Sequence, residues 1–234
     1  MNLKQHTIAE SVSITGKGLH TGELVNITLK PAAINHGIVF QRIDLENKPL
    51  IPALVDYVVD TSRSTVIEKD GGRVGTIEHL MSALAGLQID NILVEIDGPE
   101  LPILDGSALP FLELVEAAVP MEQNALRNYF SVPEAVHFKN EDKSIELAAL
   151  PLDDYRLTVM VDFNSQILHS QHAQLHEISL FKEQIAPCRT FVFVHEIEFL
   201  AKQGLIKGGD LSNAVVIAET DLSKDQISAL STLL

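Results

Sequence analysis

The sequence predicts an α+β fold in which two layered units follow one another along the chain. Predicted elements come in the order strands, helix, strand, helix, and a similar mixture then follows once more. This order favours two successive units of α+β layers rather than one doubly wound parallel sheet. The length of 234 residues is enough for two small domains, each with its own core. A polar stretch at 122–128 separates the halves, so we expect domains at 1–125 and 126–234.

The first half carries the clearest strand and helix patterns. Apolar and polar residues alternate from Glu23 to Lys30, which is typical of a strand with one buried face. The pairs Val66-Ile67 and Arg73-Val74 flank the glycine-containing segment 69–72, which predicts a hairpin turn. Further expected elements are strands at 37–43 and 91–97, and a helix at 107–118 with Phe111, Leu114, Val115 and Ala118 facing inward.

The second half shows weaker patterns of the same kind. We expect strands near 129–132, 145–150, 157–163 and 214–218, and helices at 179–185 and 196–203. Together they predict a second α+β unit.

Composition excludes several classes of function. The net charge of −15, without a cluster of Lys and Arg, argues against nucleic acid as the main partner. No apolar run approaches the ~20 residues of a membrane-spanning helix, and the first residues contain no secretory signal. Cys188 is the only cysteine, which excludes an internal disulfide and fits the cytoplasm as the expected location.

A carboxylate and an imidazole stand side by side at the start of a helix predicted to end at Gly86. The hydroxyl of Thr76 is its expected N-cap, and Glu78 and His79 follow in the first turn. A neutral imidazole there can ligate zinc, and the neighbouring carboxylate can take a proton from a water that the metal polarises. Alternatively, Glu78 only satisfies the helix start, and His79 is a partly buried helix residue.

Two glycine-rich segments lack the spacing of nucleotide-binding motifs. The segment 16–22 carries His20 but does not have the P-loop pattern, and a tight connection before a strand explains it equally well. The segment 71–75 precedes a helix without the dinucleotide fingerprint, so we discount a nucleotide cofactor.

Two further segments could carry chemistry. His169, His172 and His176 could gather one zinc ion, although the neighbouring Ser and Gln residues favour a solvated edge or loop. Thr190 follows Arg189 at the end of an element, where its hydroxyl could donate to a developing oxyanion. The alternative for Thr190 is an ordinary capping or strand residue.

Six segments, in order and in register, resemble the zinc-dependent UDP-3-O-acyl-N-acetylglucosamine deacetylases of lipid A biosynthesis in Gram-negative bacteria. They are residues 16–22, 76–80, 89–91, 99–107, 189–191 and 204–209. The resemblance implies two domains, each a β-sheet with two helices, packed as a β-α-α-β sandwich with the site between them. It also implies hydrolysis of the N-acetyl amide of UDP-3-O-acyl-N-acetylglucosamine, with release of acetate.

The resemblance also implies roles for individual residues. His79 would be a Zn²⁺ ligand, Glu78 the general base, and Thr190 a donor to the oxyanion. The residues implied to line the substrate site are Leu19, His20, Arg63, Ser64 and Phe191. Those implied to form an apolar passage for the acyl chain are Ile197, Ile206, Gly209, Ala214 and Val216.

The sequence departs from the family pattern after about Ala218. Family members continue into a helix with an H-K-x-x-D motif that supplies two more zinc ligands, and this motif is absent from the 234 residues. We therefore expect a truncated second domain and little activity from these residues alone. The parent polypeptide could also carry a fused acyl-carrier-protein dehydratase, as some relatives do. The alternatives are a metal-free nucleotide-sugar-binding or regulatory protein, and a metallohydrolase that uses the three histidines of 169–176.

Overall fold

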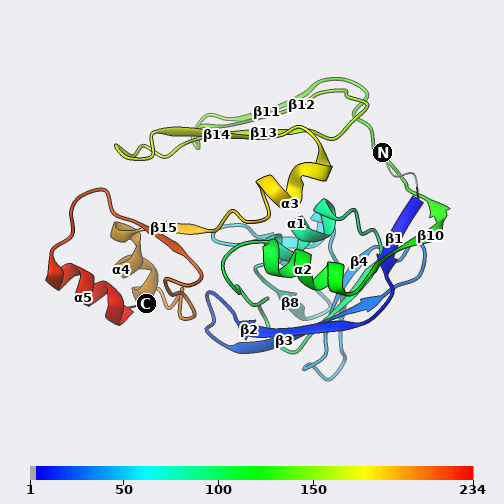
Figure 1. Cartoon of the computed structure of the whole chain (residues 1–234), viewed down its shortest axis with the longest axis horizontal. Helices are drawn as coiled ribbons and strands as arrows, with labels where there is room; N and C mark the ends of the chain where they lie inside the picture. Colours follow the sequence, from blue (N-terminus) through cyan, green and yellow to red (C-terminus); the bar gives the residue numbers. More distant parts are fainter. Residues whose placement is uncertain (1–3, 234) are drawn as a thin grey trace.

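The computed structural model describes residues 4–233, and its central element is a five-stranded mixed sheet (Figure 1). The strand order is β2-β3-β9-β4-β5, in which β4 and β9 run parallel and the other neighbours antiparallel. The strands are β2 (Val12–Lys17), β3 (Leu24–Pro31), β4 (Ile38–Arg42), β5 (Leu50–Pro52) and β9 (Ile92–Ile96).

Two smaller sheets extend the first half. β1 (Lys4–Ile8) pairs antiparallel with β10 (Pro120–Leu126), so the first and last strands of this half lie side by side. β6 (Val58–Asp60), β7 (Val66–Lys69) and β8 (Gly72–Val74) form a three-stranded antiparallel sheet that follows the short 3-10 helix η1 (Val55–Tyr57).

Two helices cover one face of the five-stranded sheet and form the core with it. α1 (Glu78–Gly86) and α2 (Leu109–Ala117) pack against each other above β2 and β3 in Figure 1. Leu80 and Leu84 of α1 and Phe111 of α2 are fully buried in the same cluster as Phe40 of the sheet. This core holds the start of α1 in a fixed position.

The second half consists of three strand pairs and three short helices. β11 (Val136–Asn140) and β12 (Ile145–Ala149) form one hairpin, β13 (Leu157–Asp162) and β14 (Ser170–Leu175) another, and β15 (Phe191–Phe193) runs parallel to β16 (Val215–Ile217). The helices are α3 (Phe181–Gln184), which follows the 3-10 helix η2 (Ile178–Leu180), α4 (Val194–Lys202) and α5 (Lys224–Leu233).

One aromatic side chain anchors the second half to the first. Phe181 of α3 is buried in the core cluster, and its ring lies against Gly86 at the end of α1. A Cβ atom at Gly86 would approach Phe181 Cδ1 to 2.2 Å, so the glycine provides the space for the ring. The amide of Ala108 also donates to the carbonyl oxygen of Ala186 at 3.0 Å.

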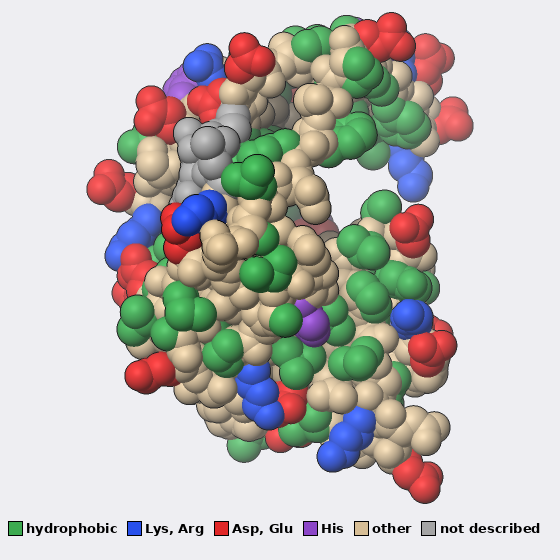
Figure 2. Space-filling view, turned by 90° about the vertical axis from the view of Figure 1, so that its right-hand side faces the viewer, with side chains coloured by type: hydrophobic (Ala, Val, Ile, Leu, Met, Phe, Trp, Pro, Cys, Tyr) green, Lys and Arg blue, Asp and Glu red, His purple; other side chains and the backbone are tan. Residues whose placement is uncertain are grey.

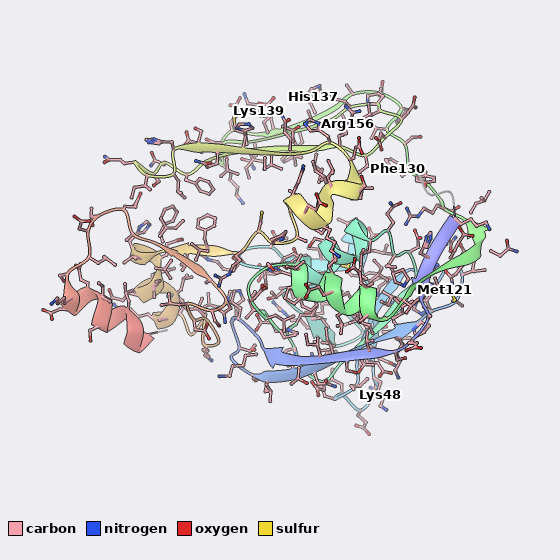
Figure 3. The ribbon with its side chains drawn as sticks, viewed as in Figure 1. Lys48, Met121, Phe130, His137, Lys139 and Arg156 are labelled. Atoms are coloured by element: carbon pink, nitrogen blue, oxygen red, sulfur yellow. The ribbon has the colours of Figure 1, made fainter. Side chains whose placement is uncertain are left out.

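The two hairpins lie above the helices and are amphipathic. In Figure 1 they form the uppermost layer, and Figure 2 shows an opening between this layer and the body of the molecule. Val136 and Phe138 share one face of β11, whereas His137 and Lys139 share the other and point upward in Figure 3. Strands β11 to β13 are exposed over almost their whole length.

The expected α+β class is confirmed, and most expected elements occur close to their predicted bounds. One expected strand is wrong, because residues 129–132 form no strand, and the polar stretch at 122–128, where we expect the domain boundary, is largely β10. The solvated edge or loop expected around the three histidines of 169–176 is an exposed strand, β14. The pairs β11–β12, β13–β14 and β15–β16 also stand in place of one continuous second sheet.

The N-cap expectation for Thr76 is also wrong. α1 begins after Ile77, without a side-chain cap, and the Thr76 hydroxyl instead donates to Glu100 at 2.8 Å. Within the described part of the chain, no helix is long and apolar enough to cross a membrane.

Candidate active site

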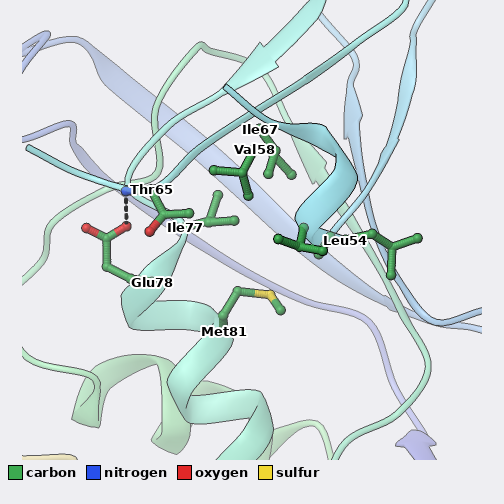
Figure 4. A pocket seen from close by; sticks show the side chains of 9 residues that line it. Leu54, Val58, Thr65, Ile67, Ile77, Glu78 and Met81 are labelled. Atoms are coloured by element: carbon green, nitrogen blue, oxygen red, sulfur yellow. Dashed lines mark hydrogen bonds between the residues drawn. The ribbon is translucent and has the colours of Figure 1, made fainter. Parts of the chain in front are cut away.

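The predicted pair of Glu78 and His79 forms the first turn of α1, and both side chains are half-buried. Glu78 Oε2 accepts a hydrogen bond of 3.0 Å from the amide of Thr65, which the dashed line in Figure 4 marks. The positive end of the helix dipole favours a charged carboxylate at this position. Glu78 is therefore held between α1 and the loop that precedes β7.

A mostly apolar pocket of about 330 Å³ lies beside the Glu78 carboxylate (Figure 4). Its walls come from η1, from the three-stranded sheet and from α1, and they include Leu54, Ile67 and Met81. Apolar walls strengthen the electrostatic interactions of a carboxylate at their edge.

The His79 ring is neutral near pH 7 and is oriented by the backbone. Burial lowers the pKa of His79 below its usual value of 6.5, although the charges of Glu78 and Asp105 and a backbone hydrogen bond to Ser107 oppose this shift. A backbone partner on one ring nitrogen orients the ring and leaves the other nitrogen for a metal ion. His79 thus fits the role of a single imidazole ligand.

Thr190 is joined to the same short segment that holds His79. Its amide donates to the carbonyl oxygen of Gly106 at 2.8 Å, and its own carbonyl oxygen accepts from Val215 at 3.0 Å. Gly106 has φ +82°, and a Cβ there would lie 1.8 Å from the carbonyl oxygen of Asn213. Gly106 and Ser107 therefore bring the start of β15 close to the first turn of α1.

Hydrogen bonds also order the neighbours of this segment. Arg189 Nε donates to the carbonyl oxygen of Asp105 at 2.7 Å, and Asp105 Oδ1 accepts from both the amide and the hydroxyl of Ser107. The turn at 105–107 is thus closed by its own side chains and tied to the strand that follows Arg189.

Two predicted substrate loops pack against each other. The amide of Gly208 donates to the carbonyl oxygen of Leu19 at 3.0 Å, and Gly209 lies close to the Leu19 side chain. Leu19, His20, Ile206 and Gly209, which the resemblance assigns to substrate binding, are therefore brought together.

The imidazole of His20 has unused hydrogen-bonding capacity. Both ring nitrogens are buried, and neither has a hydrogen-bond partner among the described residues. Burying a polar group without a partner is costly. A buried polar group of this kind takes its partner from outside the protein, as a water molecule, an ion or a ligand, or serves a catalytic role.

Arg63 and Phe191 connect to α4 and β15. Arg63 Nη1 lies 3.4 Å from Glu196 Oε1, which links the loop at 61–65 to α4. The half-exposed ring of Phe191 contacts Phe163 and Phe193 edge to face, at centroid distances of 5.3 and 5.8 Å. Of the predicted acyl passage, Ile197 is fully buried in α4, and Ala214 and Val216 are half-buried in and before β16.

The structure does not bring the three histidines of the alternative metal site together. His169 precedes β14, His172 lies on it and His176 follows it, and all three are exposed. At about 3.3 Å per residue of extended chain, His169 and His176 lie roughly 23 Å apart, which is too far for a shared ion. Among residues 4–233, no group of three or more His, Cys, Asp or Glu is placed to hold a metal ion.

Sequence reasoning missed several residues of this region. Glu100, Asn213 and Phe163 are placed by contacts between segments far apart in the chain. The one available signal was an acidic residue between Pro99 and Pro102, in the turn-rich segment 99–107. Such a residue needs hydrogen-bond partners when it is buried.

Comparison with known proteins gives consistent matches. The family model described as LpxC, UDP-3-O-acyl N-acetylglycosamine deacetylase, matches residues 5–229. A protein of Chlorobaculum tepidum named bifunctional enzyme LpxC/FabZ is 45% identical over 232 residues, which are 99% of this chain and 50% of that protein. A UDP-3-O-acyl-N-acetylglucosamine deacetylase of Myxococcus xanthus is 44% identical over 219 residues, which are 93% of this chain and 69% of that protein.

The match to a Bacteroides thetaiotaomicron protein, also named bifunctional enzyme LpxC/FabZ, has the same extent, with 44% identity over 99% of this chain and 50% of the relative. The chain thus spans about half the length of these bifunctional relatives. The family match covers both the Glu78–His79 turn and the segment of Thr190. By this match and these identities, the chain belongs to the LpxC family of UDP-3-O-acyl-N-acetylglucosamine deacetylases.

Proposed function

We propose that the whole protein hydrolyses the N-acetyl amide of UDP-3-O-acyl-N-acetylglucosamine and releases acetate, as an early step of lipid A biosynthesis. Membership of the family and the printed names of its relatives support this activity. The structural observation that carries it is the attachment of His79 and Thr190 to adjacent residues, Ser107 and Gly106. A metal ligand, a carboxylate and a hydroxyl then surround one reacting amide.

We propose Zn²⁺ as the cofactor, with His79 as one of its ligands. The observation that fits is a half-buried, neutral imidazole with a backbone hydrogen bond. At such a site Zn²⁺ supplies Lewis-acid polarisation of a carbonyl group and of water. Because residues 4–233 hold no group of three ligands, the proposal includes further ligands from the whole protein.

Glu78 serves as the general base in this proposal. Its carboxylate accepts the proton that the attacking water loses as the new C–O bond forms at the acetyl carbon. The C–N bond then breaks, and the sugar nitrogen leaves as an amine with the proton that Glu78 took from the water. The hydrogen bond from Thr65 keeps the carboxylate oriented between these two steps.

Thr190 stabilises the charge that develops on the carbonyl oxygen. Its backbone is fixed on both sides, to Gly106 and to Val215, which limits the positions that its hydroxyl can take. Preorganised donors of this kind contribute about 2.7–4 kcal/mol to the transition state.

The two packed loops and Phe191 bind the substrate in this proposal. The unpartnered ring nitrogens of His20 hydrogen-bond the sugar, Leu19 with the Arg63–Ser64 segment lines the site, and Phe191 packs near the nucleotide-sugar portion. The proposed walls of the acyl passage are Ile197, Ile206, Gly209, Ala214 and Val216.

The organisation of the protein is part of the same proposal. We place one domain at 1–125 and a second from 126 onward, in the cytoplasm, where an exposed thiol such as Cys188 stays reduced. A fused acyl-carrier-protein dehydratase is proposed for the whole polypeptide, because relatives named LpxC/FabZ match 99% of this chain.

The decisive experiment measures acetate release and bound zinc in the whole protein. We expect stoichiometric zinc and turnover that a chelator abolishes and added Zn²⁺ restores. His79→Ala should remove both zinc and turnover, whereas His172→Ala should leave both unchanged. Zinc-independent binding of UDP and of the acylated substrate, without any acetate release, would contradict the proposed hydrolase and indicate a binding protein instead.

A further inference from the structure

Glu100 is a buried carboxylate whose partners come from two different parts of the site. Its side chain is 3% exposed, and it lies between Pro99 and the turn at 105–107. A buried carboxylate is costly unless its oxygens are hydrogen-bonded. The contacts that offset this cost therefore indicate what the residue does.

The first set of partners belongs to the loop that carries the substrate residues. The amides of His20 and Thr21 donate to the carboxylate at 2.8 to 3.2 Å, and the Thr21 hydroxyl donates to Oε2 at 2.8 Å. A Cβ on Gly18 would lie 2.5 Å from Oε2, so the loop closes tightly over the carboxylate because that residue is glycine.

The second partner is the residue that leads into α1. The Thr76 hydroxyl donates to Oε1 at 2.8 Å, and Thr76 is itself buried with φ +55°. A threonine rarely adopts this left-handed conformation without support from its surroundings. Glu78 and His79 follow Thr76 after a single residue, so the bond to Glu100 acts close to the proposed catalytic pair.

The backbone around Glu100 reinforces both connections. The amide of Gly75 donates to the carbonyl oxygen of Pro99, and the amide of Leu101 donates to that of Gly75. On the other side, the amide of Ile103 donates to the carbonyl oxygen of Lys17 at 2.9 Å. Segment 99–103 thus spans from the loop at 17–22 to the entry of α1.

From this geometry we infer that Glu100 is a positioning residue of the proposed deacetylase: its carboxylate holds the substrate loop of Leu19 and His20 in register with the entry to the Glu78–His79 turn. The inference rests on the proposed function. Glu100 acts through Thr21 and Thr76 and has no contact with the reacting atoms. A site assembled from two separate segments needs such a link, because small displacements of either segment lower the rate steeply.

The two halves of the link are tested separately, with single-atom changes in the whole protein. Thr76→Val removes only the bond at the helix entry and should lower kcat about tenfold with KM unchanged. Thr21→Val removes the hydroxyl bond of the loop and should raise KM about tenfold with kcat unchanged. Thr76→Ser and Thr21→Ser keep the hydroxyls and should restore both constants to within about twofold.

Glu100→Gln affects both segments, because the amide of Thr21 and the hydroxyl of Thr76 donate to different carboxylate oxygens, and the amide keeps only one oxygen as an acceptor. We expect kcat to fall and KM to rise together. Asp90→Asn is the matched control, since Asp90 also accepts a backbone hydrogen bond, from His6, and lies outside the site. It should lower the thermal unfolding temperature and leave kcat and KM at the wild-type values.

Hydrogen exchange in this 234-residue chain tests the link without any activity. The amides of His20 and Thr21 should exchange slowly in the wild type and at least tenfold faster in Glu100→Gln. If the wild-type protein turns over substrate but the exchange rates or the kinetic constants of Glu100→Gln are unchanged, only the inference about Glu100 is overturned. A wild-type protein without turnover would instead overturn the proposed function, and the positioning role with it.

Discussion

The amide of Thr190 donates to the carbonyl oxygen of Gly106 at 2.8 Å, and the next residue, Ser107, holds the ring of His79 through its backbone. Two residues that are 111 positions apart in the sequence are thus joined to neighbouring residues of one turn. The spacing between the proposed metal ligand and the proposed oxyanion donor therefore depends on the conformation of Gly106.

Gly106→Ala should disturb this spacing. Its φ of +82° disfavours any side chain, and a Cβ would lie 1.8 Å from the carbonyl oxygen of Asn213, so the strand that begins after Thr190 must shift. We expect kcat of the whole protein to fall by about 100-fold, since displacement of about 1 Å has effects of this size. Steady-state kinetics of acetate release measure it.

Gly37→Ala is the matched control for Gly106→Ala. Gly37 has a similar φ of +74°, but a Cβ there would meet nothing within 4 Å. It should cost about 1 kcal/mol of stability and leave kcat unchanged. Equal kinetic effects of the two substitutions would show that the contact between Gly106 and Asn213 does not position Thr190.

Glu78→Gln should separate proton transfer from metal binding. The amide keeps the shape of the side chain and can still accept from the amide of Thr65, but it cannot take a proton from water. We expect kcat to fall by about 10²–10⁴-fold, the usual contribution of a general base, with zinc content unchanged. Metal analysis beside steady-state kinetics measures both, and parallel loss of zinc would assign Glu78 to metal binding instead.

Local patterns in the sequence predicted the elements that bury one regular face. Alternation from Glu23 to Lys30 gave β3 within one residue at each end, and the helical spacing after Ile77 gave α1. Each pattern arises because one face of the element is buried against a single core, so the periodicity is visible within the local sequence. The pair Glu78–His79 could be found for the same reason, since both residues lie in one helical turn.

Contacts between distant segments could not be predicted in this way. Thr76 was expected to cap α1, but the buried carboxylate of Glu100, 24 residues later, takes its hydroxyl. The stretch at 122–128 resembles a boundary between the halves because the polar residues of β10 face solvent or the side chains of β1, and pairing with the first strand depends on the whole fold. The need for a glycine at position 106 likewise follows only from the folded structure, in which Asn213 lies against it.

The ion pair of Arg42 and Asp44 predicts a pH dependence of stability. Arg42 is buried and donates from Nε and Nη2 to the two carboxylate oxygens of Asp44, at 2.8 and 2.7 Å. These hydrogen bonds lower the pKa of Asp44 below its usual value of 3.8. The stabilisation is therefore fully present above that value and is lost as the pH falls through the lower, folded-state pKa.

Asp44→Asn should lower the free energy of unfolding by about 1 kcal/mol at pH 7 and by progressively less below pH 4. Urea unfolding at several pH values measures the difference. Glu198→Gln is the control, because Glu198 pairs with Lys202 on the exposed surface of α4 and such pairs contribute little. A loss in Asp44→Asn that stays the same at pH 3 would show that the charge of Asp44 is not its cause.

Phe181→Ala should uncouple the second half of the chain from the first. The ring is buried against Gly86 and belongs to the core that holds α1 and α2. Truncation of a buried phenylalanine costs about 3–5 kcal/mol, so urea unfolding should show a loss of this size. Phe130→Ala is the control, because Phe130 is 92% exposed and its removal should change stability by less than about 0.5 kcal/mol (Figure 3). If both substitutions had equally small effects, α3 would not be anchored by this ring, and the route from Ala186 to Thr190 would have to be held by the hydrogen bonds of Ala108, Arg189 and Gly106.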